Sequence, residues 1–169
     1  MHKPDDNEAD LQLGRTIPLA NEAATIALAT SLAARLKPGF LLYLSGELGS
    51  GKTTLVRGIL RALGYTGRVK SPTYTLVELY TISRLNLYHF DFYRFRDPKE
   101  WDEAGFREHF DGDDVCIVEW PEKASGLLPP ADLEIFLKTD ASGRLATFTA
   151  HTRAGIDCVS GLKLPDGYS

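Results

Sequence analysis

Residues 46–54 read Gly46-Glu47-Leu48-Gly49-Ser50-Gly51-Lys52-Thr53-Thr54, and this stretch decides the fold. It fills every fixed position of the phosphate-binding pattern G-x-x-x-x-G-K-[ST]. The apolar run 40–45 before it predicts a buried strand, and apolar residues at helical spacing predict a helix over residues 53–63. Because a strand, a glycine loop and a helix follow one another in the order that the pattern requires, the stretch indicates a site for nucleotide phosphates rather than a chance turn.

The chemistry of this loop follows from its residue types. Glycine lets the backbone curl around a phosphate with N–H groups pointing inward, and the start of the helix adds about half a positive charge. The Lys52 ammonium can reach the β- and γ-phosphates of a nucleoside triphosphate, and the Thr53 hydroxyl can ligate Mg²⁺. The loop residues predicted to bind the nucleotide are Glu47, Gly49, Ser50, Gly51, Lys52, Thr53 and Thr54.

The composition of the chain narrows the class of protein. Its 169 residues, 43% hydrophobic and 25% charged, are typical of one globular domain. The net charge of −4 provides no overall basic surface, which argues against tight independent binding of tRNA or DNA. The acidic N-terminus does not resemble a signal peptide, and no apolar stretch approaches the roughly 20 residues of a membrane span. We therefore expect a cytoplasmic protein that does not contact a membrane.

The boundaries of the domain follow from changes in hydrophobic pattern. We expect a flexible tail over residues 1–15, one domain over 16–152 and a variable tail over 153–169. Inside the domain, a short edge strand over 16–19 precedes a helix that begins near Asn21 and runs to about Leu36. Thr25, on the first turns of this helix, is a candidate contact to the base or ribose, although spacing alone favours an ordinary helix-surface residue.

Two stretches place polar residues beside apolar strands. Ser71-Pro72-Thr73 predicts a stiff turn where switch-type nucleotidases sense the γ-phosphate, so Thr73 is a candidate sensor; a turn with solvent-facing hydroxyls fits equally well. In the alternating run 85–94, His89 and Asp91 share one face. Because strands disfavour Asp, we favour a role for Asp91 in binding metal-bound water or orienting the attacking water, over a structural bridge to His89 or an arginine.

The run Val115-Cys116-Ile117-Val118-Glu119-Trp120 is the second strong signal. An apolar strand that ends in a carboxylate has the Walker B form, in which the acid at the carboxyl edge of a parallel sheet holds Mg²⁺ directly or through water. Glu119 is therefore the second predicted acid. Trp120 is expected either at the rim of the site or packed on the edge of the sheet.

The remaining elements are expected around this centre. Residues 97–110 predict a helix that is broken at Gly105. Residues 132–138 and 145–152 predict two antiparallel strands joined by a turn at 141–143, at the edge of the sheet. Neither Cys116 nor Cys158 belongs to a metal-binding or redox spacing, so the cysteines indicate no further chemistry.

Four motifs follow one another along the chain, and together they resemble one family. They are residues 46–54, Ser71-Pro72-Thr73-Tyr74-Thr75-Leu76, His89-Phe90-Asp91-Phe92-Tyr93-Arg94 and Glu119-Trp120-Pro121-Glu122. In this order they resemble the TsaE (YjeE) family of P-loop ATPases, from about residue 16 to about residue 138. The resemblance implies an α/β, P-loop NTPase-like three-layer fold with a mostly parallel central sheet and antiparallel edge strands.

The resemblance also implies a function. Proteins of this family hydrolyse ATP to ADP slowly with Mg²⁺ and are assisted by the proteins TsaD and TsaB. They are required for repeated threonylcarbamoyl modification of adenosine 37 in tRNA but do not transfer the group themselves. In this chain Lys52, Asp91 and Glu119 would be catalytic, Thr53, Glu119 and Asp91 would form the metal site, Thr73 would lie in the switch-like loop and Trp120 would flank the site. Which acid ligates the metal and which orients water stays open. The acidic net charge suits a factor that contacts tRNA only indirectly or weakly.

Two other functions share the glycine loop. A small nucleotide or metabolite kinase would need an acceptor pocket and usually an arginine-bearing lid. The sequence between Asp91 and Glu119 shows no lid-like insertion with paired arginines, although the stretch 97–112 is long enough to contain one. A nucleotide-dependent binding module without catalysis would not need Lys52, Thr53, Asp91 and Glu119 together. An arginine finger would come from Arg57, Arg94 or Arg96, or from a partner, and its absence would explain slow turnover, because such an arginine accelerates hydrolysis about 10³–10⁵-fold.

Overall fold

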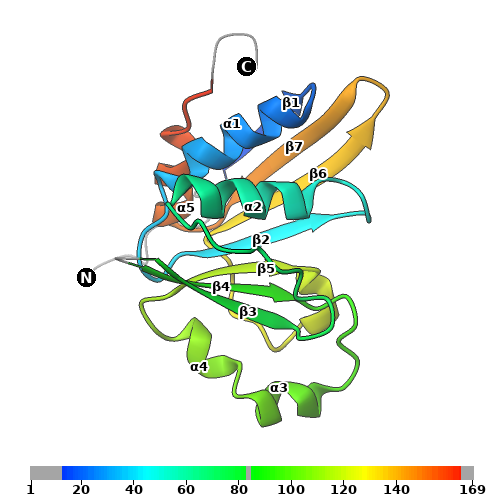
Figure 1. Ribbon diagram of the computed structural model, residues 1–169, viewed down its shortest axis with the longest axis vertical. Helices are drawn as coiled ribbons and strands as arrows, with labels where there is room; N and C mark the ends of the chain where they lie inside the picture. Colours follow the sequence, from blue (N-terminus) through cyan, green and yellow to red (C-terminus); the bar gives the residue numbers. More distant parts are fainter. Residues whose placement is uncertain (1–12, 83–84, 165–169) are drawn as a thin grey trace, which may run out of the picture.

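A seven-stranded mixed sheet runs through the computed structural model, which describes residues 13–82 and 85–164. The strands are β1 (Leu13–Leu19), β2 (Leu41–Gly46), β3 (Val77–Ile82), β4 (Leu85–Asp91), β5 (Val115–Glu119), β6 (Leu133–Asp140) and β7 (Gly143–Ala150). They lie side by side in the order β1-β7-β6-β2-β5-β4-β3 (Figure 1). The chain therefore has the expected α/β class, with the strand before the glycine loop in the middle of the sheet.

The centre and the edges of the sheet differ in strand direction. β6, β2, β5 and β4 pair in parallel, whereas β1 with β7, β7 with β6, and β3 with β4 pair antiparallel. The predicted antiparallel edges are present, but the sheet is mixed rather than mostly parallel, because parallel pairings are three of the six. Because parallel strands end at the same edge, β2, β4 and β5 bring the residues that follow them together.

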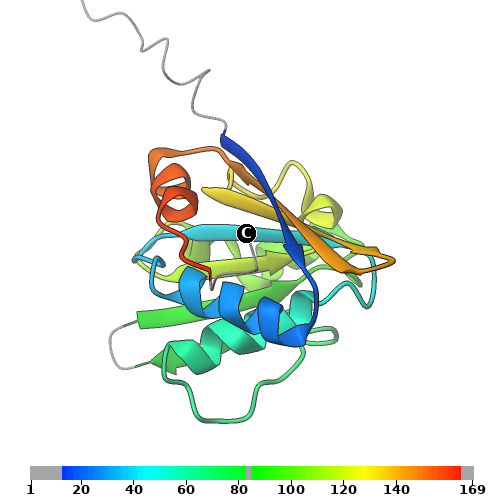
Figure 2. The same ribbon diagram turned by 90° about the horizontal axis from the view of Figure 1, so that it is seen from above.

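Helices cover both faces of this sheet. They are α1 (Glu22–Ala33), α2 (Lys52–Ala62), α3 (Pro98–Ala104), α4 (Arg107–Phe110) and α5 (Arg153–Ser160), with a 3₁₀ helix, η1 (Pro121–Ala124). α1 and α2 lie together on one side of the sheet (Figure 2). α3 and α4 lie at the other end of the molecule in Figure 1, below β3 and β4. Their side chains belong to a second core cluster, so the helices form separate layers.

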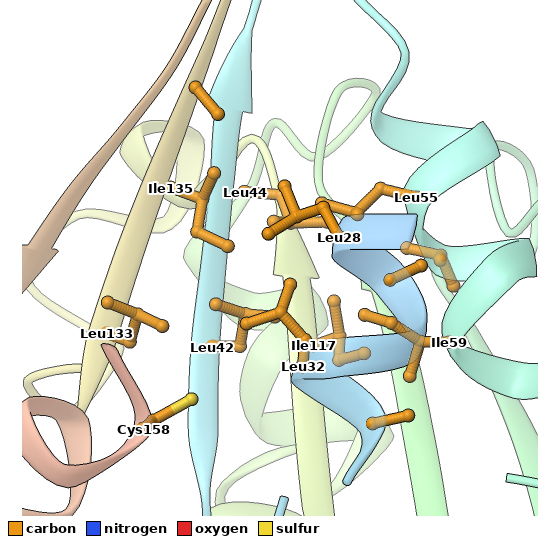
Figure 3. Close-up of a cluster of buried hydrophobic side chains, with 14 of the residues drawn as sticks. Leu28, Leu32, Leu42, Leu44, Leu55, Ile59, Ile117, Leu133, Ile135 and Cys158 are labelled. Carbon is orange, nitrogen blue, oxygen red and sulfur yellow. The ribbon is translucent and has the colours of Figure 1, made fainter. Parts of the chain in front are cut away.

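Alternation along the strands explains the two cores. In β2, Leu42 and Leu44 point toward α1 and α2, whereas Leu41 and Tyr43 point to the opposite cluster. Figure 3 shows the first core, where leucines of α1 and α2 meet those of β2 together with residues of β5 and β6. The second core is aromatic, and its buried rings are Tyr43, Phe90, Phe92, Phe95, Trp101 and Phe106.

Several predicted elements have the expected place with shifted ends. β1 begins at Leu13 rather than residue 16, and α1 ends at Ala33 rather than near Leu36. The predicted break at Gly105 is confirmed, because Gly105 has a left-handed backbone (φ 67°) and separates α3 from α4. The hairpin of β6 and β7 is also confirmed, but its expected place at the edge of the sheet is wrong, because β1 pairs with β7 and is itself the edge strand. Residues 1–12 of the expected N-terminal tail lie outside the described residues.

The segment after residue 152 departs from the expected tail. Residues 153–160 form α5, whose Cys158 and Val159 are buried in the first core. Asp132 holds the start of this helix, because its Oδ1 accepts a 2.6 Å hydrogen bond from the Thr152 hydroxyl and its Oδ2 accepts one from the Leu41 N–H at 2.8 Å. The folded chain thus extends beyond residue 152. Within residues 13–82 and 85–164, no helix has both the length and the apolar character needed to cross a bilayer.

Candidate functional site

A pocket of about 250 Å³ lies where the carboxyl ends of β2, β4 and β5 meet the start of α2. It brings together most of the predicted site residues from three separate parts of the sequence. The predicted residues that line it are Gly49, Ser50, Gly51, Lys52, Thr53, Thr54, Asp91, Glu119 and Trp120, and the unpredicted ones are Leu48 and Arg144. Three of the four sequence motifs, the glycine loop and the stretches that contain Asp91 and Glu119, therefore converge in space through the order of the parallel strands.

The glycine loop is a tight turn with three left-handed glycines. Gly46, Gly49 and Gly51 have φ values of 143°, 78° and 101°, which favour glycine over residues with a Cβ. A Cβ on Gly46 would also overlap the carbonyl oxygen of Leu137 on β6. The Ser50 N–H donates to the Glu47 carbonyl at 3.1 Å, which closes the loop before α2 begins. The loop is thus formed by its own backbone and by close contact with a neighbouring strand.

Lys52 folds back over this loop. Its ammonium donates to the carbonyl oxygens of Gly46 and, at 3.1 Å, Glu47, and it lies 4.3 Å from the centre of the Trp120 ring. The side chain is buried, and this burial lowers the pKa of Lys52, while Glu119 and Asp91 act in the opposite direction. Buried charge beside two acids suits a lysine that binds an anion within the pocket.

Two buried carboxylates oppose each other beside Lys52. Asp91 ends β4 and Glu119 ends β5, and the parallel register makes them direct neighbours. Burial raises the pKa of Asp91, Glu119 raises it further, and the hydrogen bond from the Tyr93 N–H to Oδ1 (2.9 Å), His89 and Lys52 lower it. The prediction that both acids lie at one edge of a parallel sheet is therefore confirmed by the register.

His89 contacts Glu119 rather than Asp91. Its Nε2 lies 2.6 Å from Glu119 Oε2, and both side chains are almost fully buried, with 1% and 4% of their surfaces exposed. His89 and Asp91 share a face of β4, as predicted, but the sequence interpretation of a structural Asp91–His89 bridge does not describe this contact. His89 therefore pairs with Glu119 and not with Asp91.

The polar groups of the pocket fit a phosphate group and a divalent cation. Ser50 Oγ and Arg144 Nε are buried without a hydrogen-bond partner in the described chain, and both residues line the pocket, so they fit an anionic ligand. Within the described residues, no group of three His, Cys, Asp or Glu side chains could hold a metal alone. Mg²⁺ is commonly held by one or two carboxylates together with substrate phosphates, and the Thr53 hydroxyl with Glu119 or Asp91 fits that arrangement.

Three predicted site residues lie outside the lining of this pocket. Thr25 is buried in α1, and its hydroxyl has no hydrogen-bond partner within residues 13–82 and 85–164. The Glu47 side chain is exposed, so only its carbonyl faces Lys52 and Ser50. Thr73 is half-buried, with its hydroxyl 2.7 Å from that of Ser71. None of these three predicted side chains therefore lines the pocket.

The loop that carries Thr73 is nevertheless attached to the site. The Leu76 N–H donates to the Pro72 carbonyl at 2.8 Å, and the Leu76 carbonyl accepts from the Asp91 N–H at 2.9 Å. Leu76 itself has a left-handed backbone with φ 68°, as does Trp120 with φ 56°. Strained residues of this kind gather at functional sites, and here each of them adjoins one of the two acids.

Sequence reasoning missed Arg144. This residue lies near the start of β7, and its Nη2 donates to the Gly49 carbonyl at 3.2 Å. Its guanidinium also lies 3.3 Å from where a Cβ of Gly51 would stand. The sequence carried no signal for it, because the contact depends on how the β6–β7 hairpin folds over the loop. Of the arginines proposed instead, Arg94 lies over the Tyr74 ring at 4.5 Å, and none lines the pocket.

Comparisons with known proteins are consistent with this arrangement. The model of the family described as "Threonylcarbamoyl adenosine biosynthesis protein TsaE" matches residues 19–146. A protein of Haemophilus influenzae named "tRNA threonylcarbamoyladenosine biosynthesis protein TsaE" is 46% identical over 71% of this chain and 76% of its own length. A protein of Bacillus subtilis with the same name is 43% identical over 77% of this chain and 82% of its own length. The crystal structure of Bacillus subtilis YdiB superposes with a TM-score of 0.73 at 35% identity, covering 88% of this chain and 92% of that one.

Proposed function

The chain belongs to the TsaE family, and from that premise we propose that it is an Mg²⁺-dependent ATPase that supports threonylcarbamoyl modification of adenosine 37 in tRNA. The names of its relatives support the pathway. One observation supports the ATPase: a glycine loop with a buried lysine stands beside two acids at the end of a parallel sheet. We assign the fold to the P-loop NTPase type on the same ground.

The residues of the pocket would divide the work of hydrolysis among them. The loop N–H groups and Lys52 would bind the β- and γ-phosphates, and Arg144 would add positive charge beside Gly49 and Gly51. Mg²⁺, when bound, would neutralise charge on the phosphates, held by Thr53 and Glu119. Asp91, which lines the pocket as the register neighbour of Glu119, is the candidate for orienting the attacking water, and burial raises its pKa in the direction that suits a base.

Partners and location follow from this role. We propose that the protein acts on a complex of TsaB and TsaD in the cytoplasm and resets it by ATP turnover. Contact with tRNA would be indirect or weak, since a net charge of −4 provides no extended basic surface. The exposed Leu48, Tyr74 and Tyr93 lie on or beside the site elements, at 68%, 81% and 39% exposure, and would be available to a protein partner.

The kinase alternative would require a lid in the stretch 97–112. That stretch instead forms α3 and α4, and Trp101 of α3 and Phe106, which directly precedes α4, are buried in the aromatic core beneath the sheet. Neither residue lines the pocket. A helix pair fixed in the core cannot close over a bound nucleotide, so ATP hydrolysis is the better-supported reaction.

Phosphate release from ATP tests the proposal. We expect slow release by the protein with Mg²⁺, faster release with the TsaB–TsaD pair, and loss in both Lys52→Ala and Glu119→Gln. Lys99→Ala and Glu103→Gln, at exposed positions of α3, provide matched controls that should retain activity. ATP binding without release under any of these conditions would refute the hydrolase and favour a binding module. Transfer of phosphate to an added acceptor would favour a kinase.

A further inference from the structure

His89 is a buried polar residue that no step of the proposed hydrolysis uses. It lies on β4, one position along its face from Asp91, and its imidazole is 1% exposed. Its Nε2 lies 2.6 Å from Glu119 Oε2 on the adjacent strand. Burying a polar group in an apolar core costs free energy unless a hydrogen bond compensates for it. The contact with Glu119 provides this compensation for His89.

The direction of this hydrogen bond follows from its two partners. An ionised carboxylate can only accept, so Nε2 carries the proton and donates to Glu119. Nδ1 is buried and has no partner among the described residues. With Nε2 as the donor, the His89 side chain makes its one hydrogen bond within the described chain to Glu119. The Nε2–H therefore fixes one of the two carboxylate oxygens of Glu119.

The other oxygen of Glu119 is left for the pocket. Glu119 lines the pocket, and within residues 13–82 and 85–164 no hydrogen bond engages its Oε1. Without His89, the carboxylate could rotate about its terminal bonds, because Asp91 at the neighbouring register position repels it and cannot donate to it when ionised. A group that donates to a ligating carboxylate from behind fixes the geometry of the ligating atom.

We propose that His89 is a positioning residue, which directs Glu119 Oε1 toward the divalent cation of a bound nucleotide. The inference rests on the proposed function, since it supposes that a cation binds at Glu119 and Thr53. A histidine with a purely structural role would affect folding and metal-free nucleotide binding alike. A positioning role predicts a separate loss of metal affinity, and partners of this kind contribute about 10–100-fold to metal affinity.

The test measures Mn²⁺ binding by electron paramagnetic resonance in the presence of ADP, beside ADP binding in EDTA. His89→Gln places an amide donor close to the Nε2 position, whereas the amide of His89→Asn falls short of Glu119. We expect about 10–100-fold weaker Mn²⁺ binding in His89→Asn, near-native binding in His89→Gln and unchanged metal-free ADP binding in both. His151→Asn is the matched control. His151 Nε2 lies 2.9 Å from Glu134 Oε2, and neither residue lines the pocket.

A double-mutant cycle distinguishes positioning from general damage. In a Glu119→Gln background, the His89→Asn change should cause no further loss of Mn²⁺ affinity. Equal losses in both backgrounds, or Mn²⁺ binding by folded His89→Asn within twofold of the native value, would overturn the inference while leaving the ATPase proposal intact. If the native protein bound ADP but no Mn²⁺, both the inference about His89 and the proposed metal-dependent function would be refuted.

Discussion

Replacing Asp91 by Asn is expected to stabilise the protein and to abolish ATP hydrolysis. Asp91 and Glu119 are buried neighbours on adjacent parallel strands, so at neutral pH two negative charges stand opposite each other. The amide of Asn has nearly the same shape, and its oxygen can still accept the 2.9 Å hydrogen bond from the Tyr93 N–H. The substitution thus removes a repulsion and leaves the local contact in place, while it removes the proposed water-orienting group.

The size of the gain follows from the register. Like charges directly opposite each other on neighbouring strands destabilise a sheet by roughly 0.2–1 kcal/mol. For a protein of this length, 1 kcal/mol corresponds to about 2–4 °C in the melting temperature. We therefore expect Asp91→Asn to unfold up to about 4 °C higher at pH 7 in EDTA. Lys52 limits the gain, because its ammonium already offsets part of the repulsion.

The stability difference between Asp91→Asn and the native protein is expected to depend on pH. Burial and Glu119 raise the pKa of Asp91 above its ordinary value of 3.8. Between that value and the raised one, the native state binds more protons than the unfolded state, so stability falls as pH rises. Asn does not titrate. The advantage of the variant should thus be near zero below about pH 3.8, grow as pH rises through the raised pKa of Asp91, and stay constant to pH 7.

Thermal and urea unfolding from pH 4 to pH 8 would measure this difference, with phosphate release measured on the same samples. Asp102→Asn, at an exposed position of α3, is the matched control and should change neither stability nor activity. A variant that is less stable than the native protein at pH 7 would refute the reasoning. A gain of the same size at pH 4 and pH 7 would refute it too, because it would owe nothing to ionisation of Asp91.

Three further predictions concern the loop and the two cores. Gly46→Ala should weaken ATP binding at least about tenfold by calorimetry, because the added Cβ overlaps the Leu137 carbonyl and the φ of 143° disfavours Ala; unchanged affinity would contradict the loop geometry. Gly155→Ala, whose Cβ would overlap the Asp132 carbonyl, should cost about 1–3 kcal/mol in urea unfolding, whereas Gly112→Ala, with open space around it, should be nearly neutral. Phe90→Ala should cost about 3–5 kcal/mol and flatten the near-ultraviolet circular dichroism, because Phe90 is fully buried among aromatic rings.

Local patterns accounted for much of the fold. The β2–loop–α2 unit, the break at Gly105 and the β6–β7 hairpin each depend on residues that are close in sequence, and the structure has all three. Glu119 was found because an apolar strand that ends in a carboxylate is itself a local pattern, and Asp91 was found because strands disfavour Asp. That Asp91 and Glu119 face each other required only one added fact, that strands connected by a helical segment run in parallel.

The features that sequence reasoning missed depend on contacts between distant segments. Arg144 reaches Gly49 across 95 positions of sequence, and no pattern around Arg144 distinguishes it from a solvent-facing strand residue. The α5 helix is short and begins beyond the motifs, and it is held by Asp132 through Thr152. The burial of its apolar residues in the first core depends on contact with β7. Sequence patterns describe each segment by itself, whereas these two features exist only where segments meet.

The site concentrates costs that the rest of the described chain avoids. Leu76 and Trp120 are the non-glycine residues with positive φ in residues 13–82 and 85–164, and such strain costs about 1–3 kcal/mol each. One accepts the hydrogen bond of the Asp91 N–H, and the other directly follows Glu119. A chain optimised for stability alone would carry glycine at both positions and a neutral residue at 91. The strained residues and the repelling charges lie at the same edge of the sheet. One cause, the need to place both acids in the pocket, explains them better than independent packing constraints at each position would.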